Sequence, residues 1–252
     1  LEHGMSLKDA SAYNLQFKET QPILIDTLSF EKYQEGRPWV AYRQFCQHFL
    51  APLTLMAYRD VRLNQLLRIY LDGVPLDLAA RLLPLRARFN LSLFVHVYLH
   101  ARSQNRYGDE PLKDKREGFG RLAFLGLVDS LESAVRTLNW KPKKTEWTNY
   151  YCETNYSDGA IEQKKQQVAA FLDRAKPERV WDLGANTGLF SRVSSQRGIS
   201  TIAFDVDPGA VEMNYLQCVK DKETKLLPLL LDLTNPTPRL GWANEERMDF
   251  AE

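Results

Sequence analysis

A glycine-spaced turn between two apolar segments is the part of this sequence best suited to chemistry. Residues 180–191 read V-W-D-L-G-A-N-T-G-L-F-S, which is a short apolar run, an acid, a turn and the apolar start of a helix. Glycines in such a turn let backbone N–H groups approach a ligand closely, and the helix that follows presents the positive end of its dipole. This order predicts a strand that ends beneath a nucleotide-like ligand.

Two more acids end the next predicted strands. Asp205 closes residues 201–205, roughly twenty residues after the turn, where a ribose-binding carboxylate is expected. Asp232 closes residues 226–232. Because strands alternate with helices here, we expect a parallel sheet with Asp182, Asp205 and Asp232 along one rim. A carboxylate accepts two hydrogen bonds and so suits a ribose. The alternative is that these acids are helix caps or turn acids.

The residues of the turn favour S-adenosylmethionine (SAM) over a dinucleotide. Dinucleotide sites usually carry G-x-G-x-x-G, and Asn186 stands here at the second glycine. Asp182 directly precedes the turn, and its charge would repel a diphosphate. A ligand with an ammonium and a sulfonium group suits this acid better.

The motif D-L-G-A-N-T-G at residues 182–188 resembles the first motif of class I, Rossmann-like, SAM-dependent methyltransferases. Asp205 and Asp232 match the acids after the second and third strands of that family, and the resemblance covers residues 150–252. It implies that the turn contacts the methionine part of SAM and that Val206 flanks the adenine. The cofactor-binding residues that it implies are Asp182, Gly184, Ala185, Asn186, Gly188, Asp205, Val206, Asp232 and Leu233.

The same resemblance raises an expectation about the extent of the chain. In the family, a fourth strand pairs with the first, and the residues after it shape the methyl-acceptor site. The sequence stops before such a strand, so we expect a fragment of a longer protein and a sheet cut short after its third strand. An unpaired edge at residues 180–182 would be an aggregation hazard. Neither the acceptor nor a catalytic base can be assigned from these residues.

A second constellation lies near the start of the chain. Asp9 and Asn14 have D-x-x-x-x-N spacing, and Asp26 ends the apolar run at residues 22–26, which predicts a buried strand. Kinase-type phosphotransferases need a base, an Asn and an Asp in this order. Residues 7–26 therefore resemble the catalytic loop and metal-binding strand of kinase-like, aminoglycoside-phosphotransferase-like folds. Leu7 replaces the usual His, however, and Thr27 follows Asp26 where that family has Phe.

The remaining pattern predicts two domains. Residues 1–140 are mostly helical in their apolar spacing, and residues 145–252 form the α/β, Rossmann-like domain, with the boundary in the lysine-rich residues 140–145. Residues 39–106 predict several helices, with a break near Pro52. The pair His96 and His100 has i, i+4 zinc-ligand spacing, but no third ligand is nearby. We therefore expect no metal site and a histidine pair on a helix surface.

Composition limits the class of partner and the compartment. The net charge is +1, which gives no overall field for nucleic acid or an anionic membrane, and no apolar run is long enough for a membrane span. The three cysteines are far apart, which favours a reduced, cytoplasmic protein with structural thiols. The first hypothesis is thus a SAM-dependent methyltransferase. The alternatives are a kinase-like phosphotransferase using Mg-ATP and a non-catalytic SAM-fold scaffold.

Overall fold

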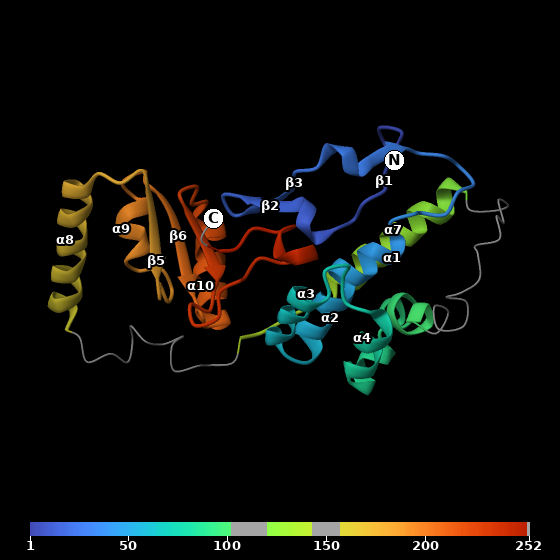
Figure 1. The fold of residues 1–252 in the computed structure, drawn as a ribbon. Helices are drawn as coiled ribbons and strands as arrows, with labels where there is room; N and C mark the ends of the chain where they lie inside the picture. The colour runs from blue at the N-terminus through green and yellow to red at the C-terminus, as the bar shows by residue number, and fades with distance from the viewer. Residues whose placement is uncertain (102–119, 143–156, 251–252) are drawn as a thin grey trace. The chain divides into compact units, whose positions relative to one another are not determined.

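The fold is α/β, and the chain divides into two compact units in the computed structural model (Figure 1). The structure describes residues 1–101, 120–142 and 157–250. Unit 1 comprises Leu1–Gln16 and Leu24–Trp140, and unit 2 comprises Phe17–Ile23 and Lys141–Glu252. Of the cysteines, Cys46 and Cys218 are free and buried, and Cys152 lies outside the described residues.

Unit 2 is built around a parallel sheet of three strands. Its main elements follow in the order α8 (Asp158–Ala175), β5 (Arg179–Leu183), α9 (Ser191–Ser195), β6 (Ser200–Asp205), α10 (Pro208–Asp221) and β7 (Leu226–Leu230). The strand order is β5-β6-β7, with Leu183 opposite Phe204 and Asp205 opposite Leu230. The alternation of strands and helices expected from the sequence is therefore confirmed, as is the parallel direction.

Local signals set the helix ends of unit 2. The hydroxyl of Ser157 accepts from the Ala160 amide at the start of α8. Asp207 caps α10 by accepting from the Gly209 amide at 2.7 Å, and Pro208 occupies the first turn, where its missing N–H costs nothing. Lys176 adopts the left-handed conformation at the end of α8, as Lys222 does after α10, and this stops each helix.

Unit 1 combines short strands with a bundle of short helices. Its strands are β1 (Met5–Leu7), β2 (Leu15–Lys18), β3 (Gln21–Leu24) and β4 (Phe30–Lys32), although part of β2 and β3 clusters with unit 2. β1 pairs antiparallel with β4, and β2 with β3 forms a second two-stranded sheet. The strand expected at residues 22–26 is present, but its predicted burial is wrong. Ile23, Leu24 and Ile25 are 39%, 36% and 51% exposed, and β3 pairs only with β2 in a two-stranded sheet among the described residues.

The helices of unit 1 enclose its hydrophobic core. They are α1 (Tyr42–Phe45), η3 (Cys46–Leu50), α2 (Ala51–Tyr58), η4 (Val61–Gln65), α3 (Leu66–Ile69), α4 (Leu76–Leu82), η5 (Leu85–Phe89), α5 (Leu91–Leu93), η6 (Phe94–Leu99) and α7 (Arg121–Arg136). Leu50, Leu55, Leu76, Leu93 and Val97 are fully buried at its centre. Instead of the break expected near Pro52, the chain stays helical through a widened π-turn, in which the Ala51 amide donates to the Cys46 carbonyl.

The expected surface pair of histidines is wrong. His96 is buried, and its ring nitrogens contact the Tyr42 hydroxyl at 2.7 Å and the Ser130 hydroxyl at 2.9 Å. The His100 ring stacks on Tyr42 with centroids 4.9 Å apart. His96 lies in η6 and His100 follows it, and both rings contact Tyr42 of α1, a partner that sequence spacing alone does not reveal. Within the described ranges, no cluster of three His, Cys, Asp or Glu side chains could hold a metal ion.

No helix among the described residues combines the length and apolar character needed to cross a membrane.

Candidate functional site

The glycine-spaced turn leaves β5 as a tight backbone loop anchored to the neighbouring strand. The amides of Gly184 and Ala185 both donate to the Phe204 carbonyl at 2.9 Å. Three residues of the turn have positive φ: Gly184 at 80°, Asn186 at 50° and Gly188 at 79°. Asparagine tolerates this region better than most residues, which accounts for Asn186 in the middle of the turn.

Asp205 connects the turn to the end of β6. One of its carboxylate oxygens accepts from the Asn186 amide at 2.7 Å, and the other accepts from the Asp207 amide at 2.8 Å. Each carboxylate oxygen has two acceptor directions, so Asp205 retains acceptor capacity toward a ligand. The same carboxylate therefore both fixes the turn and remains able to bind hydroxyl groups.

The other two acids are also held by local hydrogen bonds. Asp182 accepts from the Ser191 hydroxyl at 2.6 Å, which joins β5 to the start of α9. Asp232 lies just beyond β7 rather than in the strand, and it accepts from the amide and the hydroxyl of Thr234. The alternative that these acids stabilise turns is thus correct for part of their hydrogen bonding. Their carboxylates nevertheless face a common space.

That common space is a cavity of about 870 Å³ in unit 2. Its lining includes Asp182, Gly184, Asn186, Asp205, Val206, Asp232 and Leu233. The volume falls within the range of small-molecule sites. A Cβ added to Gly184 would meet nothing within 4 Å, so this glycine opens directly to the cavity. The three strand-end acids are therefore brought together as the sequence predicts.

Two of the predicted residues lie outside the lining, namely Ala185 and Gly188. Ala185 is buried in the small core beneath the sheet. A Cβ added to Gly188 would lie 2.5 Å from the Asn214 side chain and 2.7 Å from an Arg192 nitrogen. Gly188 is therefore required by packing inside the unit, whereas the sequence suggested that it clears space for a ligand.

One wall of the cavity comes from residues that sequence reasoning missed. Helix α8 contributes Ala160, Ile161, Lys164 and Val168, and the ring of Phe190 lies beside them. The Lys164 ammonium lies 4.6 Å from the centroid of the Phe190 ring. The amphipathic spacing of α8 predicts a helix with one face packed against the rest of the unit. That face is the sequence signal that could have identified these cavity residues. The cavity therefore joins three carboxylates to one ammonium group.

A partly buried ion pair supports the backbone of the turn. Arg192 donates through Nε to Glu223 at 2.8 Å and through Nη1 to the carbonyls of Thr187 and Gly188 at 2.8 and 3.1 Å. The side chains of Arg192 and Glu223 are only 16% and 18% exposed. Burial, together with the nearby Glu223, raises the pKa of the Cys218 thiol to about 12, so the thiol stays protonated. This network fixes the backbone of the turn without touching the cavity.

The N-terminal constellation is partly assembled in unit 1. The Asn14 amide donates to the Ser29 hydroxyl at 2.9 Å, and that hydroxyl donates to Asp26 at 2.7 Å. Asp26 also caps the short helix that follows it. Asp9 accepts from the Gln44 amide at 2.7 Å and from the Ser11 amide at 3.1 Å. Asn14 and Asp26 are thus joined through Ser29, while Asp9 is held by a different set of partners.

Comparison with known proteins shows that this chain is similar in sequence to a nodulation protein. No protein-family model matches the sequence. The chain is 35% identical to "Nodulation protein NoeA" of Rhizobium meliloti (strain 1021) over 257 aligned residues, which cover 100% of this chain and 54% of the relative. The chain therefore spans about half the length of the curated relative that it matches.

Proposed function

We propose that unit 2 binds SAM in a Rossmann-like half-sheet and belongs to a methyltransferase that acts on an acceptor still to be identified. The observation that carries this proposal is the convergence of three strand-end carboxylates and the glycine-spaced turn on one cavity. Ligands of open parallel sheets bind beyond the carboxyl ends of the strands, which is where this cavity lies.

The charges around the cavity support SAM over a dinucleotide. Asp182, Asp205 and Asp232 face the space together with Lys164. A diphosphate beside three carboxylates would be repelled, whereas the ammonium and the carboxylate of SAM each find an opposite charge, and the positive sulfonium is favoured by the net negative lining. The low polarity of Phe204, Val206 and Leu233 suits an adenine ring.

Each side chain takes a role that follows from its position. Asp205 would accept the ribose hydroxyls, and Asp232 would lie near the adenine. Asp182 would hold the ammonium group, and Lys164 the carboxylate of the methionine part. SAM when bound supplies a methyl group on a sulfonium, and orientation of the acceptor is the main contribution that a protein makes to such a transfer.

Calorimetric titration of the chain with SAM tests the proposal. We expect saturable binding that Asp205→Asn weakens by at least about tenfold, since a hydrogen bond to a charged group contributes about 1.5–3 kcal/mol. Asp173→Asn is the matched control, because Asp173 is an exposed carboxylate of α8 that lies outside the cavity lining. NAD⁺ should give no saturable heat under the same conditions.

Two outcomes contradict the proposal. One is the absence of SAM binding by the wild-type chain, which would leave a non-catalytic scaffold as the better explanation of unit 2. The other is equal loss of affinity in Asp205→Asn and Asp173→Asn, because it would show that SAM binding does not depend on the residues of the cavity.

A second candidate function is a kinase-like phosphotransferase in unit 1, favoured by the hydrogen-bonded chain Asn14–Ser29–Asp26. In this proposal Asn14 and Asp26 would hold Mg-ATP and Asp9 would act as the base. We expect Mg-ATP to raise the melting temperature of the wild-type chain and Asp26→Asn to remove that increase. A wild-type chain whose melting temperature does not respond to Mg-ATP contradicts this candidate.

A further inference from the structure

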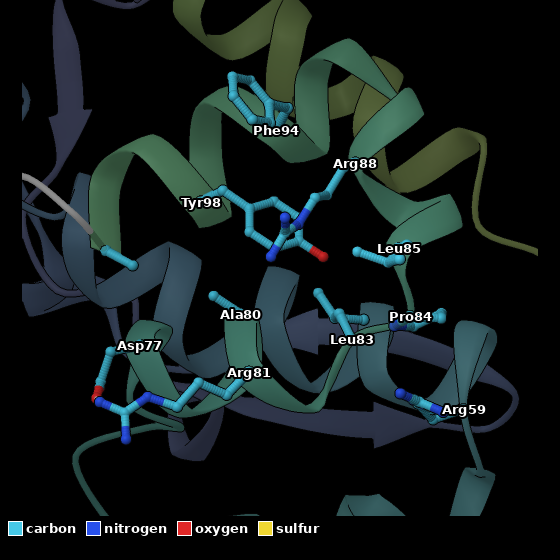
Figure 2. A pocket seen from close by; sticks show the side chains of 11 residues that line it. Arg59, Asp77, Ala80, Arg81, Leu83, Pro84, Leu85, Arg88, Phe94 and Tyr98 are labelled. Carbon is cyan, nitrogen blue, oxygen red and sulfur yellow. The ribbon is translucent and has the colours of Figure 1, made fainter.

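Unit 1 contains its own cavity, separate from the residues discussed so far. Its volume is about 610 Å³, and it lies beside α4, η5 and η6 (Figure 2). Apolar walls come from Leu83, Pro84 and Phe94, with the ring of Tyr98 between them. The volume and the apolar walls are those of a site for a small organic molecule.

The charged groups of this cavity are mainly positive. Its lining contains Arg59, Arg81 and Arg88 against one carboxylate, Asp77. Arg81 pairs with Asp77 at 3.2 Å, and Arg59 donates to the Leu82 carbonyl. The Arg88 guanidinium lies 5.1 Å from the centroid of the Tyr98 ring. Arg59 and Arg88 are exposed, and neither pairs with a carboxylate among the described residues.

A buried hydroxyl supplies an independent sign of a ligand. Tyr98 is 6% exposed, and its hydroxyl oxygen has no hydrogen-bond partner among the residues that the structure describes. A buried polar group left without a partner costs about 1–3 kcal/mol. Tyr98 belongs to the π-turn η6, and such turns occur frequently at functional sites. Figure 2 shows its ring in the middle of the cavity lining, beside Arg88.

We propose that this cavity binds an amphipathic organic carboxylate, which is a molecule with an apolar or aromatic body and one carboxylate group. The body packs against Leu83, Phe94 and the Tyr98 ring. The carboxylate accepts two hydrogen bonds from the Arg88 guanidinium, whose planar fork matches it, and a third from the Tyr98 hydroxyl. This site is independent of SAM binding in unit 2.

Calorimetry with 4-phenylbutyrate and its neutral amide, 4-phenylbutyramide, tests the proposal on the whole chain. The two probes share one body and differ in charge. We expect one molecule of the carboxylate to bind per chain and the amide to bind at least about tenfold more weakly, since one charge-assisted contact accounts for such a ratio. Arg88→Gln should lower the affinity for the carboxylate by about tenfold and leave the affinity for the amide nearly unchanged.

Two further variants complete the design. Tyr98→Phe keeps the ring and removes the hydroxyl, so it should lower the affinity for the carboxylate by about fivefold. Arg136→Gln is the control, because Arg136 is an exposed arginine of α7 outside the cavity. The absence of wild-type binding at millimolar carboxylate, equal affinity for the amide, or equal effects of Arg88→Gln and Arg136→Gln would each overturn the proposal. SAM titration of Arg88→Gln should match that of the wild type.

Discussion

The substitution Gly188→Ala separates a packing role of the glycine-spaced turn from a ligand-binding role. Gly188 has a φ of 79°, and a Cβ there would lie 2.5 Å from both polar atoms of Asn214. Asn214 is fully buried, so it has little room to move away. We therefore expect Gly188→Ala to destabilise unit 2 through two additive causes, backbone strain and steric overlap.

The magnitudes of the two causes can be estimated separately. The left-handed conformation costs a residue with a Cβ roughly 1–2 kcal/mol. Overpacking a well-filled interior adds about 1–3 kcal/mol, so the total is about 2–5 kcal/mol. Gly198 provides the matched control, because its φ is 81° and a Cβ there would meet nothing within 4 Å. Gly198→Ala should therefore lose only the roughly 1–2 kcal/mol of backbone strain.

Hydrogen exchange of peptides covering β6 measures the free energy of opening of unit 2 for each variant. Asn214→Ala removes the group that a Cβ at Gly188 would meet, so in that background Gly188→Ala should cost about 1–2 kcal/mol less than in the wild type. The Arg192 nitrogen at 2.7 Å remains, but it is the end of a flexible side chain. Equal losses in Gly188→Ala and Gly198→Ala, or strict additivity with Asn214→Ala, would refute the reasoning.

Three other predictions concern polar groups that lie wholly or partly inside the two units. Arg192→Met should destabilise unit 2 by about 1–3 kcal/mol and weaken SAM binding, because it leaves the partly buried Glu223 carboxylate without its ion-pair partner. Urea unfolding and calorimetry measure the two effects. An unchanged SAM affinity would show that the turn does not depend on the ion pair. Burial lowers the pKa of His96 below its ordinary 6.5, so the unfolded chain takes up the proton first. The free energy of unfolding should therefore be unaffected by His96 above about pH 6.5 and should decrease as the pH drops below it. Between pH 8 and pH 5, the melting temperature should fall less in His96→Gln than in the wild type. Burial raises the pKa values of Cys46 and Cys218 to about 12, so neither thiol should be alkylated by iodoacetamide at pH 8 until the chain is unfolded, as mass spectrometry of the peptides would show.

Sequence reasoning succeeded where the signal is local. The alternation of strands and helices in unit 2 follows from apolar periodicity, which depends on residues that are close together in the sequence. The convergence of Asp182, Asp205 and Asp232 follows from the parallel direction of the strands, which places their carboxyl ends on one edge. Less of unit 1 could be predicted, because its strands are short and its helices change between α, 3₁₀ and π geometry.

The sequence by itself determined the glycine-spaced turn, the alternation of strands with helices and the three acids at the strand ends. Only the tertiary structure placed Lys164 on the wall of the cavity, turned His96 into the bundle and set Asn214 against Gly188. The physical reason is the range of the interactions. Caps, turns and periodicity depend on neighbours in the sequence, whereas burial and packing partners depend on residues that the fold brings together.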